Sequence, residues 1–75
     1  MHQQEILEAL SKKYEAQIAE AKATVNIYLS NPVGIGEHPQ HLEEIDKLLE
    51  KIAGAEDKLD AIRRHWNGTL IDALS

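Results

Sequence analysis

The fold is decided by residues 45–66, which read IDKLLEKIAGAEDKLDAIRRHW. Apolar side chains recur in this stretch at alternating steps of three and four residues. They are Ile45, Leu48, Ile52, Ala55, Leu59, Ile62 and Trp66. This spacing places them on one side of an α-helix, as the a/d seam of a coiled coil over about three heptads. The sequence therefore predicts a helix from 39 to about 66.

A second stripe with the same spacing precedes this one in the chain. Its members are Leu7, Leu10, Tyr14, Ile18, Ala21, Val25 and Tyr28. The stripe predicts a helix from about 3 to 29, and each helix would be on the order of 40 Å long.

Prolines and glycines mark the boundaries of the two helices. Pro32 cannot continue the first helix, and Pro39 suits the first position of the second. Residues 30–38 are therefore expected to form a loop. Gly68 is typical of a helix end, which leaves 67–75 as a short tail. Residues 69–72, TLID, resemble a capping box, which would allow a last short helical turn.

The expected architecture is all-α, with residues 1–75 forming a single domain. It is an antiparallel helical hairpin of two long helices. In that register Leu29 would lie near Leu42, and Leu7 near Trp66. At the midpoint Ile18 would lie near Ile52 and Ala53.

The apolar surface of the second helix is too wide for one neighbour, because Leu42, Leu49 and Ala53 flank its seam. We therefore expect a homodimer that forms a four-helix bundle. The first helix carries a second line of small residues ending in an isoleucine: Ala9, Ala16, Ala19, Ala23 and Ile27. This line is explained either by the high helix propensity of alanine or by a close contact across the dimer.

Two residues of the second helix are unusual. Gly54 lies in mid-helix, on the expected solvent face, where glycine costs about 1 kcal/mol relative to alanine. Glu56 falls inside the apolar arc. Its carboxylate either reaches water at the edge of the arc or contacts Tyr14, Gln17 or Arg63.

Composition excludes several classes of function. The 75 residues include 13 acidic and 8 basic side chains, a net charge of −5, and no cysteine. An acidic chain is a poor general ligand for nucleic acid or anionic membrane, since phosphate binding depends on Lys and Arg. The polar N-terminal residues and the absence of a long apolar run predict a cytoplasmic protein without a membrane span. We expect no cofactor.

The candidates for chemistry are weak. His38, His41 and Glu37 or Glu44 cluster at the start of the second helix, but their spacing matches no strong zinc pattern. No serine has a histidine and a carboxylate arranged near it, so the sequence indicates a protein that is not an enzyme. Five basic residues would gather toward the open end of the hairpin and could touch DNA or an acidic protein: Lys12, Lys13, Lys58, Arg63 and Arg64.

The most specific string is NPVGIGEHP at residues 31–39, which is a candidate interaction loop. It comprises Asn31, Pro32, Val33, Gly34, Ile35, Gly36, Glu37, His38 and Pro39. Helix connections in bundles usually need about 2–8 residues, so this one is long. Val33 and Ile35 either plug the end of the bundle or form a recognition surface.

The string at 31–39, together with IAGAEDKL at 52–59, resembles small uncharacterised proteins encoded by T4-like marine bacteriophages. The resemblance covers the loop and the second helix. It implies a phage context, with residence in the host cytoplasm, and it implies no mechanism and no site residues.

Two functions follow as expectations. The first is a non-enzymatic helical protein–protein interaction module, a homo-oligomer acting as a phage accessory or assembly factor. The alternative is a small regulator of transcription or replication machinery that contacts protein or DNA through the basic end or the Gly-rich loop.

Overall fold

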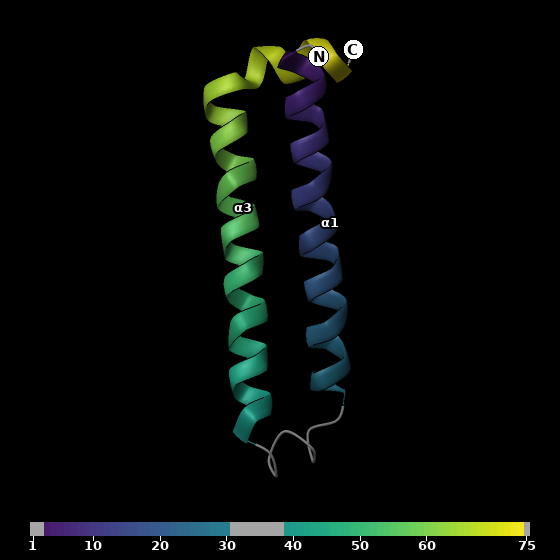
Figure 1. Cartoon of the computed structure of the whole chain (residues 1–75), viewed down its shortest axis with the longest axis vertical. Helices are drawn as coiled ribbons and strands as arrows, with labels where there is room; N and C mark the ends of the chain where they lie inside the picture. Colours follow the sequence, from purple (N-terminus) through teal and green to yellow (C-terminus); the bar gives the residue numbers. More distant parts are fainter. Residues whose placement is uncertain (1–2, 31–38, 75) are drawn as a thin grey trace.

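The computed structural model describes residues 3–30 and 39–74, and within them the side chains of 39, 67 and 69–74 lie outside that description. Helix α1 spans Gln3–Leu29 and helix α3 spans Pro39–Leu74. The two helices lie side by side and run antiparallel, as Figure 1 shows. The described part of the chain contains helix and no strand. The predicted all-α hairpin is confirmed.

The seam predicted from sequence is the contact between the helices. Every stripe residue of α1 is buried or half-buried, and Ala21 is only 1% exposed. In α3 the residues from Ile45 to Ile52 on the seam are half-buried, and Ala55, Leu59 and Ile62 are buried. The three-four spacing therefore identifies the packed face of both helices.

Two contacts between the helices fix their register. The ring centroids of Tyr28 and His41 lie 5.3 Å apart near the loop. Farther along the hairpin, Nζ of Lys58 lies 5.3 Å from the centroid of the Tyr14 ring. Both pairs agree with the predicted antiparallel register to within two residues.

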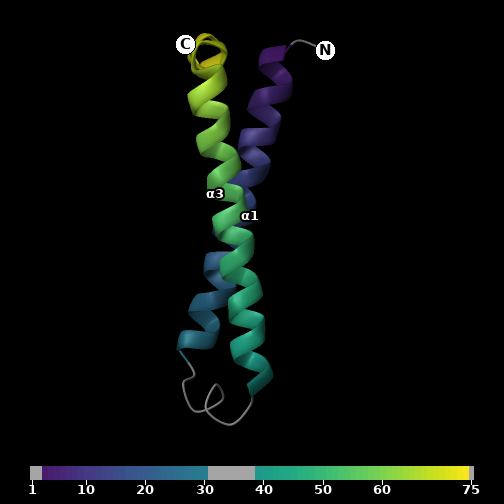
Figure 2. The same cartoon turned by 90° about the vertical axis from the view of Figure 1, so that its left-hand side faces the viewer.

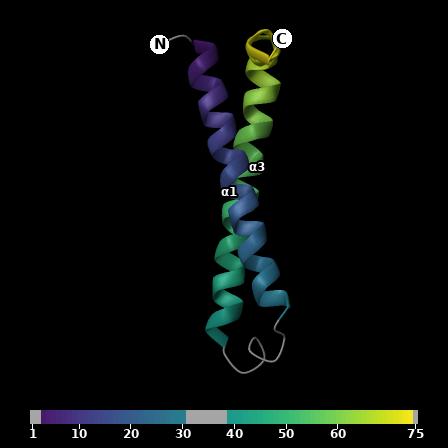
Figure 3. The same cartoon turned by 90° about the vertical axis from the view of Figure 1, so that its right-hand side faces the viewer.

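The helices cross near the middle of their length and diverge toward both ends (Figures 2 and 3). The two most buried residues are alanines, Ala21 at 1% and Ala55 at 3% exposure. Small side chains at a helix contact permit a short distance between the axes. Because the ends diverge, apolar side chains near them are less well covered than a coiled-coil seam predicts.

Trp66 leaves the seam because the backbone kinks there. Its φ and ψ angles are −132° and 27°, outside the helical region. The indole is 43% exposed and meets the His65 ring edge-on, with the centroids 5.6 Å apart. The expectation that Trp66 continues the buried seam is therefore wrong, while the expected proximity of Leu7 to Trp66 stays a prediction.

The chain returns to helix after the kink and continues to Leu74. Figure 1 shows this segment turning away from the axis of α3 and running across the open end of the hairpin. The kink at Trp66 lies where the second helix was predicted to end, but residues 67–74 form a further helical segment, which Gly68 does not end. The helical segment is longer than the single turn that the capping-box pattern allowed.

The hairpin is a thin rod. Its radius of gyration is 16.2 Å, whereas a compact domain of this length has about 11 Å. Its extents are 50 × 18 × 17 Å. Among the described residues the buried core comprises only Ala21, Ala55, Leu59 and Ile62. A core of this size gives a small margin over the conformational entropy lost on folding.

Candidate interaction surfaces

The seam divides the hairpin into two sides. Successive residues of a helix are rotated by about 100°, so the residue after a seam position and the residue before it face opposite ways. In an antiparallel pair, the residues that follow seam positions on both helices face the same side. We call this side the leucine side, and the opposite one, formed by residues that precede seam positions, the lysine side.

The leucine side is apolar in the half near the loop. Leu29 and Leu49 directly follow the half-buried seam residues Tyr28 and Leu48. Leu42 directly follows His41, which is half-buried against Tyr28. The three leucines are 59%, 59% and 52% exposed. Ala53, which follows Ile52, is exposed beside them. The prediction that Leu42, Leu49 and Ala53 are left uncovered by the other helix is confirmed.

The lysine side contains an open hollow of about 390 Å³ between the helices. Five of its lining residues each precede a seam position: Gln17, Lys47, Lys51, Gly54 and Lys58. Glu50 and the buried Ala55 complete the lining. With three lysines and one glutamate, the hollow is basic, whereas the chain as a whole carries −5.

Two of the lysines have partners on the hairpin itself. Lys58 lies over the Tyr14 ring, a cation–π geometry. Nζ of Lys47 lies 3.7 Å from Oε1 of Glu44, one turn earlier on the same helix. Both members of that ion pair are more than half exposed, so the pair contributes little to stability and is open to exchange.

Gly54 is half-buried at the edge of the seam and lines the hollow, with its Cβ direction facing open space, which agrees with the expected solvent face. A Cβ built at this position would meet no atom within 4 Å. Packing within the chain therefore does not require glycine here.

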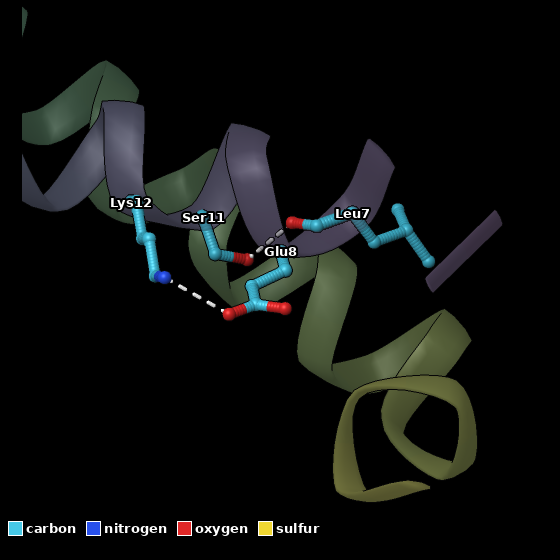
Figure 4. Close-up of polar contacts among 4 residues, drawn as sticks. All are labelled: Leu7, Glu8, Ser11 and Lys12. Carbon is cyan, nitrogen blue, oxygen red and sulfur yellow. Dashed lines mark hydrogen bonds and ion pairs between the residues drawn. The ribbon is translucent and has the colours of Figure 1, made fainter. Parts of the chain in front are cut away.

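The predicted basic end is not one patch. Nζ of Lys12 lies 2.9 Å from a Glu8 carboxylate oxygen, and the neighbouring Ser11 hydroxyl donates to the Leu7 carbonyl at 2.8 Å; Figure 4 shows the four residues. The hydrogen bond and the charge of Glu8 raise the pKa of Lys12 above its ordinary 10.5.

Arg64 is also engaged on its own helix, with Nε 2.9 Å from an Asp60 oxygen. Lys58 lines the hollow, while Lys13 and Arg63 are exposed. The structure therefore distributes the five predicted residues over several sites.

The remaining candidates have ordinary surroundings. His41 is half-buried against Tyr28, and Glu44 pairs with Lys47. Among the described residues, no three His, Asp or Glu side chains gather as metal ligands would. Glu56 is exposed, so its carboxylate reaches water, which was one of the two expected outcomes.

The predicted interaction loop, 31–39, lies outside the described residues except that Pro39 is the first residue of α3, as expected. His38 and Glu37, the other candidates for metal binding, fall in the same gap. The hollow was not predicted from the sequence. The signal was present in the spacing, since Lys47, Lys51 and Lys58 each stand one residue before an apolar seam position.

Over residues 3–30 and 39–74, neither helix has an apolar stretch of the length that a membrane crossing needs. No protein-family model matches the chain, and no curated protein or solved structure matches it. The two sides of the hairpin are therefore the candidate functional surfaces.

Proposed function

We propose that this chain is a non-enzymatic helical interaction module that pairs with a second copy of itself through the leucine side. The pair forms a four-helix bundle. The observation that carries the proposal is the exposure of Leu29, Leu42 and Leu49 on one side of a hairpin whose own core is small. Fully burying one such side chain contributes roughly 1.5–3 kcal/mol, which is large against the stability of a 75-residue chain.

The surface area supports a partner of this size. The chain exposes 5543 Å², whereas a compact folded chain of 8.4 kDa exposes about 4,600 Å². The excess of about 900 Å² is close to the roughly 800 Å² that each partner buries in a standard protein–protein interface. One copy of the hairpin supplies a matching apolar surface.

The half of the leucine side near the loop is also the less charged half. There Lys22 and Asp46 are the charged residues that follow seam positions. Toward the open end the same side carries mainly carboxylates: Glu8, Glu15, Glu56 and Asp60. Contact between copies is therefore favoured where the leucines are, because charged groups are costly to bury without partners.

The wider role that we propose is that of a phage accessory or assembly factor. It is supported by the resemblance of residues 31–39 and 52–59 to small proteins of T4-like phages. A self-associating rod suits a scaffold or adaptor, because its length presents long side surfaces to other chains.

Light scattering coupled to size-exclusion chromatography tests the pairing. We expect the native chain to have about twice the monomer mass of 8.4 kDa at high micromolar concentration. Leu49→Lys should give the monomer mass. Ile27→Lys is the matched control, because Ile27 is 69% exposed but precedes Tyr28 and so faces the lysine side. A monomeric native chain, or a Leu49→Lys variant that stays dimeric, would refute the proposal.

A further inference from the structure

We propose that the hollow on the lysine side is a docking groove for an acidic α-helix of a partner protein, distinct from the second copy on the leucine side. The two surfaces lie on opposite sides of the seam. Gln17 on α1 and Lys47, Lys51 and Lys58 on α3 place polar and cationic groups along the groove. The groove is about 390 Å³ and open, which suits a segment lying across it rather than an enclosed small molecule.

Gly54 is the first argument for an external occupant. Glycine inside a helix lowers stability relative to alanine. In a folded protein that loss is explained when a neighbouring group needs the space of the Cβ, but here a Cβ would meet no atom within 4 Å. The space is open to a group from outside the chain, and a second backbone can approach closest where no side chain projects.

Charge is the second argument. The lining holds three lysines and one glutamate in a chain of net charge −5. An acidic partner is therefore attracted to this groove and repelled from most of the remaining surface, which gives the contact its orientation. The repulsion from the rest of the chain also disfavours a long polyanion such as duplex DNA.

The spacing of the lysines is the third argument. Lys47, Lys51 and Lys58 stand four and seven residues apart on one side of α3. Their Cα atoms are therefore about 6 and 10 Å apart along the axis, at 1.5 Å per residue. A single phosphate cannot bridge such a row. Carboxylates at steps of four and seven residues on another helix match it, with the gap between them over Gly54.

Binding of a labelled peptide to the full-length chain tests the proposal. The probes are alanine-based helical peptides with three glutamates at steps of four and seven residues, one peptide for each chain direction, measured by fluorescence anisotropy. Control peptides carry glutamine in place of glutamate. We expect one glutamate peptide to bind at least tenfold more tightly than its control. Equal binding of the two would overturn the proposal.

Substitutions in and outside the groove test whether the peptide binds there. Gly54→Gln fills the groove with a residue of good helix propensity, so it should weaken peptide binding at least tenfold while the midpoint of thermal unfolding rises. Lys47→Gln with Lys51→Gln should weaken it similarly. Lys12→Gln with Arg64→Gln changes the net charge equally, lies outside the groove, and should leave binding within twofold. Native affinity in Gly54→Gln would overturn the proposal.

Two further outcomes separate this groove from the pairing of copies. Leu49→Lys should bind the peptide with native affinity, whether or not the native chain is a dimer. If Gly54→Gln loses the dimer, the groove belongs to the second copy, and the proposal of a different partner fails. Tighter binding of a duplex DNA of matched charge would likewise overturn the choice of an acidic helix.

Discussion

At the scale of single residues, Gly54 is a position where helix stability favours alanine and the proposed partner binding favours glycine. Its missing Cβ has open space around it, and helices prefer alanine to glycine by about 1 kcal/mol. We expect Gly54→Ala to raise the midpoint of thermal unfolding by about 4–8 °C. Circular dichroism on heating measures this. A lower midpoint would show that the glycine backbone is needed within the hairpin.

Lys12 gives a second prediction at the residue scale. Because the pKa of Lys12 is raised mainly by the hydrogen bond to Glu8, Glu8→Gln should return it toward 10.5. The sign follows from linkage. The protonated lysine is favoured in the folded chain, so its contribution to stability is present below about 10.5 and is lost as the pH rises through the higher folded pKa.

NMR titration of the lysine side chains measures the pKa of Lys12 in the native chain and in Glu8→Gln. Lys22, which is exposed on the same helix and has no Glu8 beside it, is the internal control and should not respond to the substitution. An unchanged Lys12 pKa in Glu8→Gln would mean that the 2.9 Å contact is not formed in solution.

At the scale of elements, the crossing of α1 and α3 depends on two methyl side chains. Ala21 and Ala55 are the most buried residues, so a larger side chain there must push the helices apart. We expect Ala21→Leu to lower the free energy of unfolding by about 1–3 kcal/mol. Ala23→Leu, at an exposed position of the same helix, should change it little. Urea unfolding measures both, and equal effects would contradict the close crossing.

The elements were largely predictable from the sequence, because apolar spacing and proline placement act locally. The stripe from Leu7 to Tyr28 is shielded throughout, and α3 begins at Pro39 as expected. Trp66 was not predictable, since its apolar character continues the heptad while its backbone leaves it. The helix after Gly68 was predicted only as one short turn, because glycine permits a stop without imposing one.

The interaction surfaces were only partly predictable, for a geometric reason. The apolar periodicity of α3 identifies a stripe that is too wide for one helix to cover, and so it correctly predicted that Leu42 and Leu49 stay exposed. A hollow depends on two helices at once: Gln17 and Lys51 are joined only by the register of the packed pair. The periodicity of α3 alone placed Gly54 on an open face, but it could not show that this face is one wall of a hollow.

At the scale of the whole molecule, the rod shape makes stability depend on association. Partners that bind only the folded chain stabilise it by mass action. We therefore expect the unfolding midpoint of the native chain to rise with protein concentration, and that of Leu49→Lys to stay constant. Calorimetry over a hundredfold range of concentration measures this. A constant midpoint in the native chain would argue against the pairing of copies.

The crossing geometry has a dynamic consequence. The two helices touch near their middles and diverge at their ends. Local opening of the backbone therefore breaks more contacts, and costs more free energy, at the crossing than near the ends. Amide hydrogens around Ala21, Ala55 and Leu59 should exchange with deuterated water most slowly, and those near Gln3 and Leu29 most quickly. The hairpin would then fray from both ends toward a protected centre, so a partner that docks near an end also suppresses local unfolding there.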